Sequence, residues 1–150
     1  MKINTRFLYV VILCLLMVSL IITGRKKNET QTDTNIFKSI TIQEAANLVE
    51  ENINNPDFII LDVRTPSEFA EGHIKGAINI DFYSETFRDE LDVLNKTKIY
   101  FVYCRSGNRS GQAMEIMKSL GFSTVYNLSA AGMGDWIANG LPYKTASGTE

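Results

Sequence analysis

The chain has 150 residues, of which 45% are hydrophobic and 21% are charged, and its formal net charge is −2. This length fits one domain with a short extension, and the composition is that of an ordinary globular protein. The slightly acidic balance gives no reason to expect a nucleic acid as partner, because proteins that bind nucleic acids usually carry a strong basic excess.

The first predicted element is hydrophobic. Lys2 and Arg6 precede an apolar run over residues 7–22 that only Ser19 interrupts. The run is short for a bilayer span and long for the core of a signal peptide. We therefore expect residues 1–24 to form an N-terminal membrane anchor or signal segment, with an uncleaved hydrophobic helix as the first choice. Basic residues flank the run on both sides, so its orientation stays open. We expect a membrane-anchored or exported domain on the extracytoplasmic side.

The rest of the chain divides into a polar tether at residues 25–37, one domain at residues 38–146 and a tail at residues 147–150. Capping signals and helical spacing predict five helices, at residues 42–53, 66–71, 84–94, 108–120 and 133–139. Runs of apolar and β-branched residues predict four clear strands, at residues 58–63, 77–80, 98–103 and 123–128. Strands that alternate with helices predict an α/β fold, with a central, mostly parallel sheet of about five strands and helices on both faces.

Cys104 is the residue that points most directly to chemistry. It follows the strand at residues 98–103, precedes a helix, and has Arg105 and Arg109 close by in the sequence. Helix N-termini and nearby cations lower the pKa of a cysteine, and the thiolate is its nucleophilic form. The plainer interpretation is a small buried hydrophobic residue at the end of a strand. With His73 as the single histidine and no Cys-x-x-Cys pair, we expect neither a metal nor another cofactor.

Three stretches resemble the family of rhodanese-like domains: residues 61–80, residues 104–109 (CRSGNR) and residues 131–143. The resemblance covers residues 38–145 and implies a rhodanese-like fold with sulfurtransferase activity. Cys104 would take a sulfane sulfur from a donor such as thiosulfate or a persulfide and pass it to a thiol or another thiophilic acceptor. Ala131 departs from the pattern, because the family often has glycine there. This change matters only if that position needs a positive φ.

The loop that follows Cys104 is the expected substrate-binding site. Consecutive backbone N–H groups in a curled loop form a cradle for an anion, and the following helix adds its positive end. The residues expected to form this cradle are Arg105, Ser106, Gly107, Asn108 and Arg109. The two arginines add charge that would hold the thiolate or attract an anionic donor, although the one at the helix start could instead brace the loop.

Asp62 and Arg64 are expected to support the site, because they end a strand at the same edge of the sheet as Cys104. Asp62 would accept hydrogen bonds from amides of the loop. Arg64 would form an ion pair with Glu68, four residues later, and fix the corner between strand and helix. We expect His73 to satisfy loop backbone rather than to take part in catalysis.

Two other functions remain as alternatives. Phosphatases and arsenate reductases use a related loop, but phosphatases place five residues between the cysteine and the arginine. Here four residues separate Cys104 from Arg109, and Ser110 holds the position that a phosphatase would need. The second alternative is a membrane-tethered module that binds a partner or carries sulfur without turnover. The sequence does not specify the natural donor, the acceptor or the oligomeric state.

Overall fold

The computed structural model describes residues 35–145, 148 and 149. Its centre is a sheet of five parallel strands in the order β1-β6-β5-β2-β4. These strands are β1 (Ile36–Ile40), β2 (Phe58–Asp62), β4 (Ile78–Asn79), β5 (Ile99–Tyr103) and β6 (Thr124–Leu128). The expected α/β fold with a parallel sheet of about five strands is therefore confirmed.

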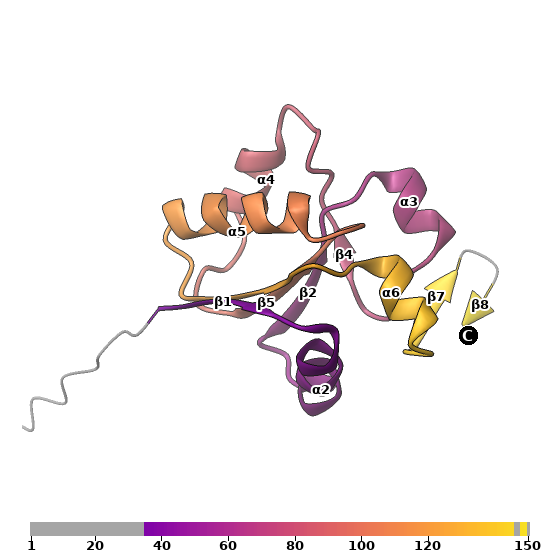
Figure 1. The fold of residues 1–150 in the computed structure, drawn as a ribbon. Helices are drawn as coiled ribbons and strands as arrows, with labels where there is room; N and C mark the ends of the chain where they lie inside the picture. The colour runs from indigo at the N-terminus through magenta and orange to yellow at the C-terminus, as the bar shows by residue number, and fades with distance from the viewer. Residues whose placement is uncertain (1–34, 146–147, 150) are drawn as a thin grey trace, which may run out of the picture. The chain divides into compact units, whose positions relative to one another are not determined.

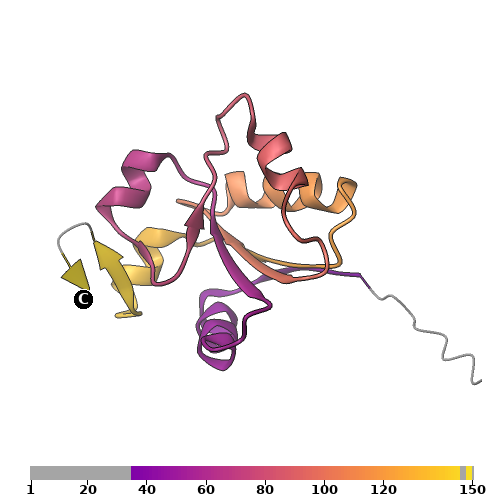
Figure 2. The same cartoon turned by 180° about the vertical axis from the view of Figure 1, so that it is seen from behind.

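Helices cover both faces of this sheet (Figures 1 and 2). The helices are α2 (Ile42–Asn52), α3 (Pro66–Glu71), α4 (Phe87–Asp92), α5 (Asn108–Ser119) and α6 (Met133–Ala138). Figure 1 shows α4 and α5 on one face and α2 on the other. Helices α2 and α3 each begin with a complete capping box, formed by Thr41 with Glu44 and by Thr65 with Glu68. These boxes satisfy backbone donors that a helix start would otherwise leave open.

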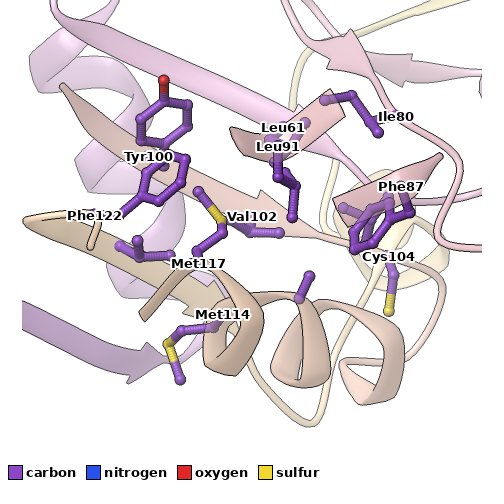
Figure 3. Close-up of a cluster of buried hydrophobic side chains, with 13 residues drawn as sticks. Leu61, Ile80, Phe87, Leu91, Tyr100, Val102, Cys104, Met114, Met117 and Phe122 are labelled. Carbon is purple, nitrogen blue, oxygen red and sulfur yellow. The ribbon is translucent and has the colours of Figure 1, made fainter. Parts of the chain in front are cut away.

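Two hydrophobic clusters fill the space between the helices and the sheet. Cluster one lies under α4 and α5 and contains Leu91, Met117 and Cys104 (Figure 3). Cluster two lies under α2 and α6 and contains Val49, Met133 and the fully buried Trp136. Residues of β2 and β5 alternate between the two clusters, as strands covered on both faces must.

The structure differs from the sequence prediction at both ends of the domain. Strand β1 begins at Ile36, so two residues assigned to the tether belong to the sheet. A second, antiparallel sheet joins β3 (His73–Ile74), β7 (Tyr143–Thr145) and β8 (Gly148–Thr149), the last of which lies within the expected tail. The expected hydrophobic helix at residues 1–24 lies outside the described residues. Within the described part of the chain, no helix has the length and apolar character needed to span a bilayer.

Candidate active site

Cys104 lies at the carboxyl edge of the sheet, directly after the central strand β5. Strands β5 and β2 run parallel with Tyr103 opposite Asp62, so both chain segments leave the sheet side by side. The amide of Val63 donates to the carbonyl of Tyr103 at 3.0 Å and extends the pairing by one residue. Figure 3 shows Cys104 at one end of cluster one, with its sulfur pointing away from the other labelled side chains.

The chain curls around the sulfur before helix α5 begins. Gly107 makes this possible because it adopts φ +88°, a left-handed conformation that favours glycine. Its amide donates to Cys104 Sγ at 3.2 Å, and the buried Ser110 hydroxyl donates to the same sulfur at 3.5 Å. The 12-residue helix α5 therefore starts with its positive end at the loop.

These donors decide the ionisation of the thiol. Cys104 is only 1% exposed, and its burial raises the pKa. The Ser110 hydroxyl and the amides of Ser106, Ser110 and Gly107 lower the pKa by more, so the net pKa lies below the ordinary value of a cysteine. The site therefore favours a thiolate in spite of its burial.

The loop packs against the backbone of two later segments, residues 128–130 and residues 132–133. A side chain at Gly107 would press on the backbone of residues 128–130, with its Cβ 2.9 Å from the amide nitrogen of Ala130. A side chain at Gly132 would collide with the carbonyl group of Arg105. The amide of Met133, at the start of α6, donates to the carbonyl of Cys104 at 3.1 Å. Ala131 has no positive φ, so the absence of a glycine there causes no strain.

The two loop arginines have different surroundings. Arg109 donates through both terminal nitrogens to the carboxylate of Glu68, at 2.8 Å each, and its guanidinium lies 5.5 Å from the centre of the Tyr83 ring. Arg105 is exposed, and within the part of the chain that the structure describes its side chain has no hydrogen bond or ion pair. The expected ion pair between Arg64 and Glu68 is therefore wrong, because Glu68 binds Arg109 instead.

Arg64 forms its ion pair with Asp62. The Asp62 carboxylate is fully buried and accepts from the Arg64 amide at 2.9 Å and from its Nη2 at 2.6 Å. Arg64 also donates to the carbonyl of Gly72, and its guanidinium lies over the Tyr103 ring, with Cζ 5.6 Å from the ring centre. Burial lowers the pKa of Arg64, but the hydrogen bond and charge of Asp62 raise it more. The prediction that Asp62 accepts from loop amides is wrong, since Arg64 occupies its oxygens and the pair fixes the end of β2.

His73 contacts helix α3. Its Nδ1 is 3.0 Å from the carbonyl oxygen of Phe69, and its ring stacks on the Phe69 ring with centroids 3.8 Å apart. His73 therefore contacts backbone, as expected, but the carbonyl belongs to helix α3 rather than to a loop. Among the residues that the structure describes, no three His, Cys, Asp or Glu side chains come together as metal ligands.

Two open hollows flank the loop, of about 670 and 560 Å³. Arg105 and Glu68 line both of them. Phe82 and Tyr83 line the larger hollow, and the sequence analysis missed both of these residues. The available signal was their position, because two adjacent aromatic residues follow a short strand at the same edge of the sheet. The arrangement offers a thiol with a lowered pKa in an amide-lined loop, with the exposed Arg105 beside it.

Comparison with known proteins bears on the family and the fold. The model of the rhodanese-like domain family matches residues 45–139. A thiosulfate sulfurtransferase of Escherichia coli, PspE, is 39% identical over 75 residues, which are 50% of this chain and 70% of that protein. A tRNA uridine(34) hydroxylase of Photorhabdus laumondii is 34% identical over 89 residues, which are 55% of this chain and 25% of that protein. The crystal structure of a rhodanese-related protein from Thermoplasma volcanium has a TM-score of 0.58 and 34% identity, covering 71% of this chain and 97% of that one.

Proposed function

Because the chain belongs to the family of rhodanese-like domains, we propose that it is a sulfurtransferase that carries a sulfane sulfur on Cys104. The observation that carries this proposal is the sulfur at the centre of inward-pointing donors. The amide of Gly107 and the hydroxyl of Ser110 both donate to it. Such donors suit an anionic sulfur in two states, the resting thiolate and the outer sulfur of a persulfide.

The proposed reaction has two displacement steps. In the first, the Cys104 thiolate attacks the outer sulfur of thiosulfate, a sulfur–sulfur bond forms, and sulfite leaves with the electron pair of the broken bond. In the second, an acceptor thiolate attacks the outer sulfur of the persulfide, and Cys104 leaves as a thiolate. Neither step needs a proton on Cys104, so an activated thiolate is the main requirement.

Arg105 is the proposed docking group for an anionic donor. It is exposed at the mouth of both hollows, whereas the charge of Arg109 is already paired with Glu68. An unpaired guanidinium attracts anions, so Arg105→Ala should slow transfer from thiosulfate more than transfer from an uncharged donor.

The decisive experiment is detection of the persulfide on the full-length chain. After exposure to thiosulfate, intact-mass analysis should show one added sulfur atom, and a thiol acceptor should then remove it. Cys104→Ala should abolish the addition, while Cys14→Ser, which changes the other cysteine, should leave it in place. Absence of the added sulfur with thiosulfate, polysulfide and glutathione persulfide alike would refute the proposed function. Stoichiometric loading without turnover would instead identify a sulfur carrier.

The apolar residues 7–22 between two basic groups support a further proposal, that residues 1–24 hold the domain at a membrane. The full-length chain should then sediment with membranes, and a soluble full-length chain would contradict this.

A further inference from the structure

Glu68 connects helix α3 to the active-site loop. Its carboxylate accepts from the amide and the hydroxyl of Thr65, at 3.0 Å each, as part of the capping box of α3. The same carboxylate accepts hydrogen bonds from both terminal nitrogens of Arg109, which lies 41 residues later in the chain. These hydrogen bonds, the one from Arg109 first among them, lower the pKa of Glu68 to about 2, so it is ionised throughout the neutral range.

Arg109 is held from two sides. Its two terminal nitrogens face Glu68, and its guanidinium packs over Tyr83. The hydrogen bonds of Glu68 raise the pKa of Arg109, and the charge of Cys104 adds to the rise. Arg109 lies in the loop that curls around the sulfur, between Gly107 and Ser110, which both donate to Cys104 Sγ. A positive charge on Arg109 would therefore stabilise a thiolate, and the paired carboxylate of Glu68 would oppose that effect.

Arg105 has no such counter-charge among the described residues, and its side chain borders both hollows. The loop thus contains two arginines, of which one is neutralised and fixed and the other is free to meet a ligand. This division depends on Glu68, since it is the carboxylate that binds Arg109.

We propose that Glu68 is a positioning residue that sets the charge around Cys104: it holds Arg109 against α3 and cancels its charge, which leaves Arg105 as the single effective cation for an anionic donor. This inference rests on the proposed function for its substrate. Its electrostatic part concerns the thiolate alone.

The test compares Glu68→Gln, Arg109→Gln and the double variant in the full-length chain with Cys14→Ser, so that Cys104 is the single thiol. The pH profile of alkylation by iodoacetamide reports the thiolate. The ratio of persulfidation rates with thiosulfate and with the uncharged dimethyl trisulfide reports the charge that a donor meets. Glu115→Gln, on the exposed side of α5, is the control for an equal change of net charge.

Glu68→Gln and Arg109→Gln should shift each readout in opposite directions. Glu68→Gln unmasks Arg109, so the pH of half-maximal alkylation should fall by about half a unit and the rate ratio should rise about threefold. Arg109→Gln should raise that pH and lower the ratio. The double variant should return close to the parent protein, and Glu115→Gln should change neither readout beyond the effect of net charge.

A purely mechanical brace would give another pattern. If Glu68→Gln and Arg109→Gln both raise the pH of half-maximal alkylation, the loop has simply loosened and the proposal is overturned. Arg109→Lys keeps the charge without the paired geometry, and its profile should stay near that of the parent even if Arg109→Gln folds poorly. If the parent protein forms no persulfide while its alkylation profiles shift as expected, the proposed function fails and the role of Glu68 stands.

Discussion

Hydrogen bonds, rather than exposure to solvent, lower the pKa of the Cys104 thiol. Burial alone would raise its pKa and keep it neutral, as it does for structural cysteines. The donors lie within six residues along the chain, from the amide of Ser106 to the hydroxyl of Ser110. The loop therefore favours the ionised form of a sulfur inside the fold, where few solvent molecules compete for its lone pairs.

Ser110→Ala removes the donor that lowers the pKa of Cys104 most. One hydrogen bond to an anion corresponds to about one pKa unit at this length, so the pKa should rise by roughly that amount. Because the thiolate is lost as the pH falls through the pKa, the variant should react with iodoacetamide ~10-fold more slowly at mildly acid pH. At a pH above both pKa values the two rates should agree.

Ser106→Ala is the matched control for this prediction. Ser106 contributes its backbone amide, which alanine keeps, and its side chain is exposed, so the alkylation profile of Ser106→Ala should match that of the parent. Identical profiles for Ser110→Ala and the parent would contradict the assigned role of the hydroxyl.

The sequence predicted Cys104 and its loop because strand end, glycine and helix start follow one another locally. It mispredicted Glu68 for the opposite reason. A spacing of four residues made Arg64 the obvious partner, whereas the true partner, Arg109, is 41 residues away. Contacts between distant segments leave no periodic pattern, so side-chain pairing across the site could not be derived from spacing.

At the scale of elements, the start of α6 supports the loop that follows Cys104. Gly132 lies against the carbonyl of Arg105, and the amide of Met133 donates to Cys104. The backbone of Gly132 is extended, with φ −162°, so the requirement for glycine comes from the close approach of two backbones rather than from strain.

Gly132→Ala should therefore displace the loop. Neither backbone can yield easily, so we expect a loss of about 1–3 kcal/mol in the free energy of unfolding together with a loss of sulfur transfer. Urea unfolding followed by circular dichroism, with the persulfide assay beside it, measures both effects.

Gly134→Ala, in the same helix, is the control, because a Cβ there meets no atom within 4 Å. It should leave stability equal or slightly higher, since alanine favours helices, and it should keep far more sulfur transfer than Gly132→Ala. Equal behaviour of the two variants would show that the close approach at Gly132 is unimportant.

Local signals account for the elements that the sequence predicted well. The capping box at Thr41 forms as expected and marks the start of α2. Pro66 marked the start of α3, where the structure adds a capping box at Thr65 that was not predicted. Strands β3 and β7 escaped prediction because each is short and gains its order from the other, about 70 residues away in the chain. Strand β1 was hidden by the polar residues around it and is fixed by pairing with β6.

At the scale of the whole domain, the two hydrophobic clusters lie on opposite faces of one sheet, whose strands contribute side chains to both. Trp136 lies in cluster two, and Cys104 lies at the end of cluster one (Figure 3). Strands β2 and β5 supply side chains to both clusters, for example Leu61 to one and Ile60 to the other. Neither cluster can lose its packing while the shared strands stay in place, so the two faces should unfold as one unit.

This predicts coincident unfolding from two probes on opposite faces of the sheet. In a chain with Cys14→Ser, the fluorescence of the single tryptophan and the reactivity of the single thiol should give the same midpoint in urea.

Leu91→Ala, which removes a fully buried side chain of α4, should lower both midpoints together. The expected loss in the free energy of unfolding is about 2–4 kcal/mol. Val49→Ala, on the α2 face, should also move both probes in parallel. If Leu91→Ala exposed the thiol at a lower urea concentration than it unfolded the tryptophan site, the two faces would be separate folding units, and the coupling inferred from the shared strands would be wrong.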